Sequence, residues 1–464
     1  MSQKNETTVL VLALLITLGV ASGVFWFFKD NIIPQNKTIN NPELIKQRIS
    51  FGEKITTVDT SPAKKAGIEA LAGGDYNKAI ANLEAALRLK RNDPEALIFL
   101  NNARIASAKS YTIVTSLPVV TDPSAYEEIL RGIAQAQNEI NASGGIKGVP
   151  LKIGIANDDD KPAISKQIAT TLVDNQQVLG VIGHNTSDAT LAAGTVYNSG
   201  KLVAITPTST SVKITDFSHY VFRTVPSDFI AARSLANYMV NKLQKKNVAV
   251  FFNSQSGYSK SLKSEFVSSV SLEGGQVSNE FDLSQTNFSA AKSVEQATKQ
   301  GAEVLMLAAN NNTLDKALQV VQVNDKRLAM LGGDDVYTLK TLEIGREKAV
   351  GMVVAVPWHI DGNPSSEFPL SSRKLWGADV NWRTALAYDA TKALIAALEI
   401  NPTREGVQQA LTSSSFSVTG ASGAIRFLPS GERNAPVQLV TIAPGTRSRT
   451  GYDYVPIPQS PLKN

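Results

Sequence analysis

The sequence predicts an α/β protein whose parallel sheets form two doubly wound lobes. From Tyr111 onward, short apolar runs alternate with amphipathic segments over ~340 residues, a pattern typical of parallel sheets covered by helices. The runs fall into two groups of four with a break at 223–226. This grouping favours two lobes over a single eight-stranded barrel. The first group is 111–117, 151–156, 178–183 and 202–206, the second is 248–252, 303–308, 328–332 and 351–356, and β-like runs return at 424–428 and 436–443.

Residues 1–30 contain an uncharged apolar stretch. Thr7 to Phe28 is 22 residues long, about 33 Å as a helix against a hydrocarbon core of ~30 Å. The aromatic residues 25–28 and the following Lys29 are typical of a membrane surface. We therefore predict a single-pass membrane anchor. The positive-inside count does not decide its orientation, because basic residues stand on both sides of the stretch. The alternative is a signal peptide cut near 20–22, which would free the rest of the chain from the membrane.

Two segments separate this stretch from the α/β region. Residues 31–62 are rich in Asn, Thr and Lys and contain three prolines, so we predict a linker. In residues 63–108, small residues recur at helical spacing around a Gly-Gly-Asp turn at 73–75, and residues 94–106 form a further helical segment. The pattern resembles a single tetratricopeptide repeat. We expect a helical hairpin that spaces or docks the main domain; the alternative is a peptide-binding groove.

Composition excludes several classes of function. The chain has 464 residues, 43% hydrophobic and 19% charged, which is the composition of a globular protein of several domains. Its net charge of +5 is not concentrated in a basic block, so we expect no nucleic-acid partner. The absence of cysteine excludes disulfides, thiolate metal sites, thiol nucleophiles and a lipidated cysteine. The sequence contains no Gly-x-Ser-x-Gly elbow, Walker loop or zinc motif. We therefore predict neither an enzyme nor a bound cofactor.

Hydroxyl side chains follow two neighbouring apolar runs of the first group. Thr186 and Ser187 come after 178–183, and a Thr/Ser cluster at 206–210 comes after 202–206. In a parallel sheet the carboxyl ends of adjacent strands meet the N-termini of the following helices. Hydroxyls and free backbone N–H groups there can hold a small anion such as a carboxylate. No general base stands beside these hydroxyls in the sequence, so the pattern predicts binding. The simpler interpretation is that Ser187 only caps a helix.

Eight short motifs occur in order across three quarters of the chain. They are Ile-Leu-Arg-Gly at 129–132, Asn-Ala-Ser-Gly-Gly-Ile-Lys-Gly at 141–148, Asp-Asp-Asp at 158–160, Val-Ile-Gly-His at 181–184, Ile-Thr-Pro at 205–207, Gly-Tyr at 257–258, Gly-Gly-Asp at 332–334 and Ala-Tyr-Asp-Ala at 387–390. Together these motifs resemble the type I periplasmic binding proteins of the leucine/isoleucine/valine-binding family, the solute receptors of amino-acid ABC transporters. The layout of anchor, helical repeat and lobe pair is similar to that of cyanobacterial members.

The resemblance implies a two-lobe clamp that closes over an amino acid. The chain would cross between the lobes three times, near Pro226, near Val356-Pro357 and near Gly423-Ala424. These crossovers assign residues 111–226 plus 358–423 to the first lobe and residues 227–357 plus 424–455 to the second. Residues 456–464 form a tail.

The resemblance also implies how an amino acid is held. Its α-carboxylate would bind Ser187, Thr208 and Thr210 of the first lobe, with Thr186 lining the pocket. Its ammonium group would pair with Asp334, at the end of the second-lobe strand near 328–331.

Three further positions are candidates for ligand contact. Asn310 stands where, in the family that the chain resembles, an aromatic residue often stacks on the ligand, and it predicts a pocket more polar than a branched aliphatic ligand requires. Tyr126 lies near the position of an aromatic residue of the first-lobe pocket in the resembled family, and His184 lies beside the hydroxyl cluster.

Four aspartates are expected to have structural roles. We expect Asp158, Asp159 and Asp160 to cap a helix and face solvent rather than bind a metal. Asp389 is expected to be a buried structural partner.

With this resemblance, the leading functional hypothesis is an extracytoplasmic solute-binding receptor. It would be anchored by a single pass on the periplasmic side of the bacterial inner membrane or, after signal cleavage, soluble in the periplasm. It would capture an amino acid, or a related small zwitterion or carboxylate, and deliver it to the permease subunits of an ABC importer. The alternative is the ligand-sensing ectodomain of a signalling complex, because the same clamp also serves receptors. A membrane tether and a helical repeat fit either hypothesis.

Overall fold

A computed structural model describes residues 42–57 and 60–458. The chain divides into two units, residues 1–45 and 46–464, and the folded elements discussed below belong to the second unit. Helix α2 (Pro42–Lys46) spans this division, with only its last residue in the second unit. No helix among the described residues is long and apolar enough to span a membrane. The proposed anchor at 7–28 lies outside these residues, so the anchor and the cleaved signal both stay predictions.

The helical hairpin predicted for 63–108 is present. Helices α3 (Pro62–Ala72) and α4 (Tyr76–Leu89) pack against each other, and α5 (Pro94–Ile105) follows. Each helix begins after a Ser or Asp whose side chain accepts a hydrogen bond from a first-turn N–H. Gly67 allows the close approach of α3 and α4, since a Cβ there would lie 2.7 Å from Leu83 Cγ. The tetratricopeptide identity of the hairpin stays a prediction.

The hairpin is docked on the first sheet. Helix α5 packs against α6 (Pro123–Ala142) and strand β3 (Leu151–Asn157). Asn102 Nδ2 donates hydrogen bonds to the backbone oxygens of Ile153, at 2.7 Å, and Phe51, at 2.8 Å. The predicted linker is also partly structured, because β1 (Ile49–Ser50) pairs antiparallel with β3. A two-residue edge strand is too short to produce a periodic signal in the sequence.

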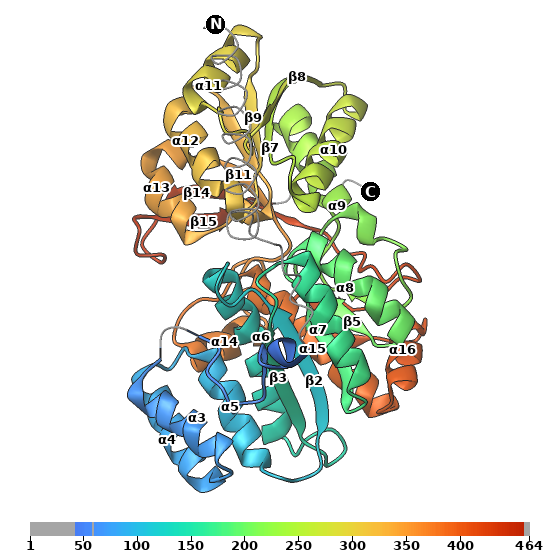
Figure 1. Cartoon of the computed structure of the whole chain (residues 1–464). Helices are drawn as coiled ribbons and strands as arrows, with labels where there is room; N and C mark the ends of the chain where they lie inside the picture. The colour runs from blue at the N-terminus through green and yellow to red at the C-terminus, as the bar shows by residue number, and fades with distance from the viewer. Residues whose placement is uncertain (1–41, 58–59, 459–464) are drawn as a thin grey trace, which may run out of the picture. The chain divides into compact units, whose positions relative to one another are not determined.

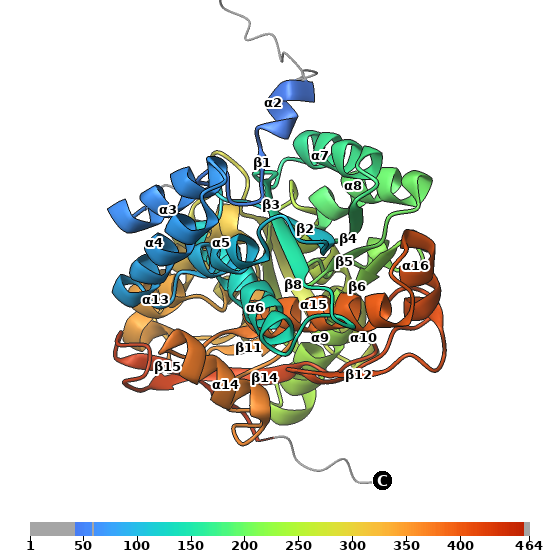
Figure 2. The same cartoon turned by 90° about the horizontal axis from the view of Figure 1, so that it is seen from below.

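The first lobe is built around a six-stranded sheet of order β1-β3-β2-β4-β5-β6 (Figure 1). All neighbouring strands except β1 run parallel. Helix α6 packs against α15 (Trp382–Ile400) and α7 packs against α8. Figure 2 shows these two helix pairs on opposite faces of the sheet, as expected for a doubly wound lobe. The remaining elements are β2 (Tyr111–Leu117), β4 (Val178–Gly183), β5 (Ala204–Thr206), β6 (Val221–Arg223), α7 (Pro162–Asp174), α8 (Ser187–Gly200), α14 (Glu367–Trp376), α16 (Arg404–Thr412) and a short 3₁₀ turn, η1 (Val212–Ile214).

The second lobe is built around a seven-stranded sheet of order β15-β14-β11-β10-β9-β7-β8. Strands β7 to β11 are parallel, whereas β14 and β15 are antiparallel additions at one edge. Every residue of the apolar strand β9 (Val304–Ala308) is buried, which fits a strand covered on both faces. Helices α9 and α10 pack together, as do α11, α12 and α13. The elements are β7 (Asn247–Phe252), β8 (Gln276–Asp282), β10 (Ala329–Gly332), β11 (Val353–Val356), β14 (Gln438–Pro444), β15 (Tyr452–Pro456), α9 (Asp228–Asn237), the π-turn η2 (Tyr238–Lys242), α10 (Gly257–Leu272), α11 (Ala290–Lys299), α12 (Leu314–Asn324), α13 (Leu339–Ala349), and the 3₁₀ turns η3 (Asn311–Thr313) and η4 (Asp334–Val336).

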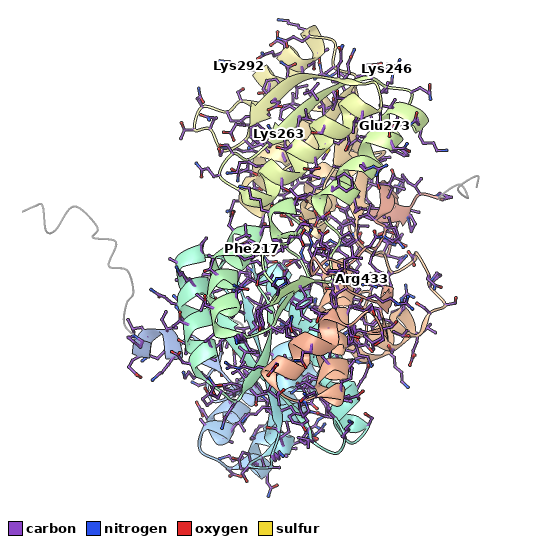
Figure 3. All side chains as sticks on the ribbon, turned by 90° about the vertical axis from the view of Figure 1, so that its right-hand side faces the viewer. Phe217, Lys246, Lys263, Glu273, Lys292 and Arg433 are labelled. Carbon is purple, nitrogen blue, oxygen red and sulfur yellow. The ribbon has the colours of Figure 1, made fainter. Side chains whose placement is uncertain are left out.

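The third crossover lies later than the sequence predicts. Residues near 423–424 begin β13 (Gly423–Ile425), which pairs with β12 (Val418–Gly420) in a local hairpin packed on α15. The chain stays with the first lobe as far as Arg433, whose Nη1 lies 2.8 Å from Asp389 Oδ2. Figure 3 shows Arg433 beside the first lobe, away from Lys292 of the second. The chain joins the second sheet only at β14, so the boundary moves from 424 to between 433 and 438. Asp389 is buried, as predicted.

Candidate functional site

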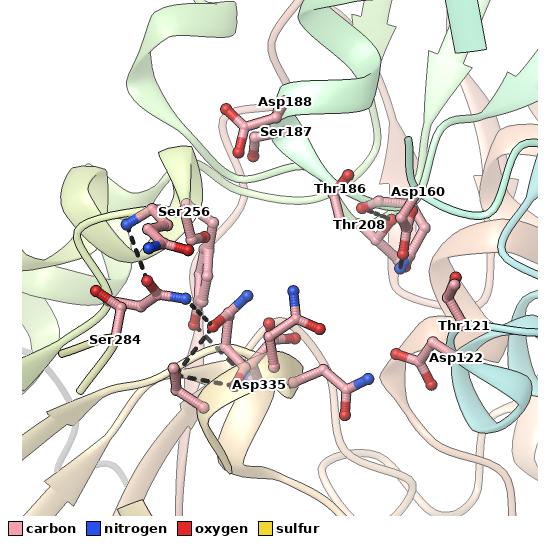
Figure 4. Close-up of a pocket in the computed structure, with 18 of the residues that line it drawn as sticks. Thr121, Asp122, Asp160, Thr186, Ser187, Asp188, Thr208, Ser256, Ser284 and Asp335 are labelled. Carbon is pink, nitrogen blue, oxygen red and sulfur yellow. Dashed lines mark hydrogen bonds between the residues drawn. The ribbon is translucent and has the colours of Figure 1, made fainter. Parts of the chain in front are cut away.

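A cavity of about 800 Å³ lies between the two lobes. Nearly all of its lining residues follow the carboxyl ends of strands, as expected for a ligand site in open α/β sheets. Figure 4 shows the cavity with polar side chains on several sides. The first-lobe strands β2 to β5 contribute Thr121, Asp122, Asp159, Asp160, Lys161, Pro162, Asn185, Thr186, Ser187, Asp188 and Thr208; the second-lobe strands β7 to β10 contribute Asn253, Gln255, Ser256, Tyr258, Leu283, Ser284, Asn310, Asn311, Asn312, Thr313, Lys316, Asp334 and Asp335; Arg383 comes from α15.

The N-terminus of α8 faces this cavity. Thr186 is its N-cap residue, yet its side chain makes no capping hydrogen bond, and its buried Oγ1 has no hydrogen-bond partner. The first N–H groups of a helix lack partners within the helix and carry partial positive charge. Ser187 opens the helix and its Oγ accepts a hydrogen bond from Ser211 N at 3.2 Å. Thr208 Oγ1 donates to Asn185 O at 2.8 Å, which fixes the loop between β4 and α8. The predicted residues Thr186, Ser187 and Thr208 are therefore gathered at one helix N-terminus, a type of position that can hold an anion.

Thr210, also predicted to bind the carboxylate, does not line the cavity. It is buried, and its carbonyl oxygen accepts hydrogen bonds from Arg223 Nη1 at 2.9 Å and Asp228 N at 2.8 Å. Thr210 thus joins the strand-end loop to the start of α9. The sequence places it near Thr208, but the chain turns away between the two residues.

His184 lies beneath the hydroxyl cluster instead of contacting the cavity. Its side chain is fully buried, with Nδ1 2.5 Å from Asp158 Oδ2 and Nε2 3.0 Å from Tyr197 OH. Its carbonyl oxygen accepts a hydrogen bond from Thr206 Oγ1 at 2.8 Å. The prediction that Asp158 faces solvent is wrong, because this carboxylate is buried against the histidine.

Tyr126 is also outside the cavity. Its side chain is buried, and its hydroxyl forms a hydrogen bond of 2.7 Å with Thr56 Oγ1, a residue that precedes the hairpin. The residue lies on α6, four positions after the N-cap residue Asp122. Tyr126 therefore connects the hairpin to the first lobe. The loop before α6 reaches the cavity through Thr121 and Asp122 instead.

The second lobe presents Asp334 to the cavity from the first position of η4. Its side chain is 6% exposed, and its Oδ1 accepts a hydrogen bond from Tyr258 OH at 2.7 Å. Burial raises the pKa of Asp334 to about 6. Gly333 makes this arrangement possible, because a Cβ there would lie 2.5 Å from the Tyr258 hydroxyl oxygen.

Asn310 forms part of the polar wall of the second lobe. Its Oδ1 accepts hydrogen bonds from Asn253 Nδ2 at 2.8 Å and Thr313 Oγ1 at 3.0 Å. The residue lines the cavity together with Asn311 and Asn312. The predicted polar character at this position is therefore present in the structure.

The sequence analysis did not single out Asp122, Asp188 or Asp335 of the cavity. It expected Asp160 to face solvent, which is wrong, because Asp160 lines the cavity and its Oδ1 is buried. Asp122 and Asp160 follow first-lobe strands, and this position in the chain could have identified both as site residues. Asp335 is paired with Arg383, with Oδ1 2.7 Å from Nη2, across the two lobes. No sequence signal joins these two residues, because they are 48 positions apart on different elements.

Burial raises the pKa values of two of these carboxylates. The pKa of Asp160 is raised to about 8, with a further contribution from the charge of Asp158. Burial also raises the pKa of Asp335 to about 7 in spite of the nearby Arg383. Within the described part of the chain, no group of three or more His, Asp or Glu side chains is arranged to hold a metal ion. The arrangement is suited to holding a charged solute.

Comparisons with known proteins agree with this architecture. A family model described as periplasmic binding protein matches residues 121–447. An amino acid binding protein of Pseudomonas aeruginosa is 37% identical over 125 residues, which cover 27% of this chain and 33% of that protein's length. The Leu/Ile/Val-binding protein homolog 3 of Brucella melitensis biotype 1 is 25% identical over 301 residues, 63% of this chain and 80% of that protein.

The solved structure of an ABC transporter substrate-binding protein from Desulfitobacterium hafniense, in complex with Leu, has a similar fold. It superposes with a TM-score of 0.63 at 21% identity and covers 75% of this chain and 100% of that one. At this level of identity the likeness establishes the two-lobe fold alone.

Proposed function

Because the chain belongs to the periplasmic binding protein family, whose members are binding proteins rather than enzymes, we propose that it captures a free amino acid or a related small zwitterion. In this proposal the receptor acts outside the cytoplasm and delivers its ligand to the permease subunits of an ABC importer. The names of the relatives in Pseudomonas and Brucella, which refer to amino-acid binding, support this ligand class.

The observation that carries the proposal is the pairing of opposite charges across one cavity. Thr186, Ser187 and the N-terminus of α8 offer donors for a carboxylate on the first lobe. Asp334 offers a buried acceptor for an ammonium group on the second lobe. An α-amino acid carries both groups on one carbon, so it can engage both lobes at once. Binding across the lobes then favours the closed clamp.

Calorimetry of the full-length chain against the twenty amino acids and related small acids tests the ligand class. We expect at least one α-amino acid to bind. At 100 times its dissociation constant, this ligand should raise the free energy of unfolding by about 2.7 kcal/mol. A screen in which only sugars or only carboxylates without an amino group bind would overturn the proposal.

Thr186→Val tests the carboxylate site with little change in volume. Loss of the unpartnered hydroxyl should weaken binding about tenfold, as expected for one hydrogen bond to a charged group. Thr195→Val, at an exposed position of the same helix, is the matched control. Equal affinity in both variants would place the carboxylate elsewhere.

The transport role and the membrane tether need separate tests. Co-purification of the full-length protein with permease subunits would support import, whereas capture of a signalling protein would favour the sensor alternative. Mass spectrometry of the mature N-terminus decides between an anchor and a cleaved signal. A mature chain starting near residue 23 would remove the tether.

A further inference from the structure

The cavity offers little apolar surface to a ligand side chain. Of its lining residues, only Pro162 and Leu283 have wholly aliphatic side chains. Tyr258 lines the cavity as well, but its hydroxyl is committed to Asp334. A branched aliphatic side chain is stabilised by contact with apolar groups, and its burial against unpaired polar groups costs free energy. The lining therefore favours a ligand with a polar side chain.

The lining carries an excess of negative charge. When all are ionised, six carboxylates face three cationic side chains, which leaves an excess of three; Arg48, which pairs with Asp159 at 3.0 Å from outside the lining, reduces it to two. Because the pKa values of Asp160 and Asp335 are raised, this excess is complete only above about pH 8. Lys316 is already counted among these cations, and its Nζ is held by the backbone oxygens of Leu283 and Gln285. A zwitterion is neutral overall, so it cannot remove this excess. The carboxylates are Asp122, Asp159, Asp160, Asp188, Asp334 and Asp335, and the cations are Lys161, Lys316 and Arg383.

Two of these carboxylates form an acidic corner on the first lobe, which we define as Asp122 and Asp160. Figure 4 shows both residues on the same side of the cavity, with Thr121 and Thr208 beside them. Neither residue forms an ion pair within the described ranges 42–57 and 60–458. Asp160 Oδ2 accepts a hydrogen bond from Asn185 Nδ2 at 3.0 Å, while its buried Oδ1 has no hydrogen-bond partner.

The acidic corner also acts on the facing lobe. The charge of Asp122 contributes to the raised pKa of Asp160 and to that of Asp335, so Asp122 repels both of these carboxylates. Arg383 balances only one of them, through its contact with Asp335. A second cation placed at the corner would relieve this repulsion.

We propose that the ligand is a basic amino acid, whose cationic side chain lies against Asp122 and Asp160. This inference rests on the function proposed above, because it assumes that Asp334 and the α8 N-terminus hold the α-ammonium and α-carboxylate groups. A guanidinium group fits the corner well, because its planar set of donors can contact two carboxylates at once. The acidic corner then selects the side chain, while the hydroxyl cluster and Asp334 recognise the backbone groups of the amino acid.

The test compares L-arginine with L-citrulline, which has nearly the same shape but no side-chain charge. Calorimetry of the full-length chain at pH 8 should show arginine binding at least about tenfold more tightly than citrulline, with L-lysine also preferred over L-leucine. Agmatine, which is arginine without its carboxylate, should bind more weakly than arginine. A cavity that binds citrulline or leucine as tightly as arginine overturns the basic-side-chain proposal and leaves the amino-acid proposal standing. Failure of every amino acid to bind overturns both.

Asp122→Asn tests the position of the cation. Asp122 Oδ1 caps α6 by accepting a hydrogen bond from Ala125 N at 3.0 Å, and asparagine caps helices equally well. The variant should therefore fold normally and lose about tenfold of the preference for arginine over citrulline. Asp75→Asn makes the same change at the exposed cap of α4, outside the cavity, and should leave the preference unchanged.

Asp160→Asn is a second test at the same corner and should reduce the preference in the same way. An unchanged preference in correctly folded Asp122→Asn and Asp160→Asn variants would overturn the placement of the cation at the acidic corner.

Discussion

A hydrogen bond between Asp188 and Gly257 joins the two lobes at the N-terminal ends of helices α8 and α10. Asp188 Oδ2, in the first turn of α8, accepts a hydrogen bond from Gly257 N, the first residue of α10, at 2.8 Å. A carboxylate at a helix N-terminus is favoured by the partial positive charge of the free N–H groups. The contact lies beside the cavity, since Asp188 lines it. It is therefore positioned to change with opening and closing of the clamp.

Gly257→Ala should weaken the closed state. A Cβ at this position would lie 2.3 Å from Asp188 Oδ1, so the two side chains must separate. We expect a larger radius of gyration by small-angle scattering in the presence of ligand and a loss of affinity of about 3- to 10-fold, the value of one charged hydrogen bond. Ser264→Ala, at an exposed position of the same helix, is the control. If Gly257→Ala leaves both quantities unchanged, the contact does not take part in closure.

Asp334→Asn should weaken ligand binding with little effect on folding, because the side-chain volume is nearly preserved. Loss of one partner of a desolvated charge pair typically costs ~2–5 kcal/mol of binding free energy. Tyr258→Phe removes only the hydroxyl that donates to Asp334 and should cost about 1 kcal/mol. Calorimetry with the best ligand of the screen measures both. Full affinity in Asp334→Asn would mean that the ligand has no ammonium group or holds it elsewhere.

The sequence predicts the buried strands well and the edges poorly. Strand β9 is an apolar run because both of its faces are covered, and such a run is visible in the chain. Strand β8 lies at the sheet edge, is half-exposed, and reads Gln-Val-Ser-Asn-Glu-Phe-Asp. Its short alternation has no apolar run to mark it. The hairpin of β12 and β13 misled the placement of the third crossover for a similar reason, since pairing within a hairpin depends on a neighbouring segment.

For the site, the sequence locates strand ends but not the direction of each side chain. Thr186 and His184 both follow β4, yet one lines the cavity and the other is buried beneath it against Asp158. The chain direction in a strand-end loop depends on contacts such as the hydrogen bond from Thr206 Oγ1 to His184 O, which only the folded structure brings together. The pair of Asp335 and Arg383 depends on two lobes meeting, and local sequence carries no trace of it.

The ligand-free protein should lose stability as the pH rises from 6.5 to 8.5. Burial raises the pKa of Asp228 to about 7, that of Asp335 to about 7 and that of Asp160 to about 8. In this window the folded state holds protons that the unfolded chain has already released, so the free energy of unfolding falls with pH. This stabilisation is complete below the ordinary aspartate pKa and is lost as the pH passes through the raised values.

Urea denaturation at several pH values measures this slope. His359 acts in the opposite direction, because burial lowers its pKa, but its effect is confined to lower pH. Asp228→Asn should flatten the slope between pH 6.5 and 8.5, whereas the exposed Asp75→Asn should not. A stability that rises over this range in the wild-type chain would contradict the assignment of buried, partly protonated carboxylates.

The last prediction concerns the hairpin, which is held to the main domain by a buried charge cluster. Lys64 Nζ lies 2.6 Å from Glu95 Oε2 and 2.9 Å from Asp93 Oδ2. Glu95 Oε1 also accepts a hydrogen bond from Thr56 N at 2.8 Å, and Thr56 in turn contacts Tyr126 of the first lobe. The cluster therefore links the hairpin, the segment before it and helix α6.

Lys64→Met removes the cation and leaves two buried carboxylates without their partner. We expect a loss of about 3–5 kcal/mol in the free energy of unfolding, since breaking a buried pair leaves the remaining charge buried without a partner. Lys65→Met is the matched control, because Lys65 and Glu69 form an exposed pair at 3.9 Å that should contribute less than about 0.5 kcal/mol. If the hairpin were an independent spacer, Lys64→Met would leave the main unfolding transition in place and affect only a separate, earlier one. A single transition shifted to lower urea concentration would instead mean that the hairpin and the first lobe unfold together. In that case, removal of the residues before 111 would destabilise the binding domain itself.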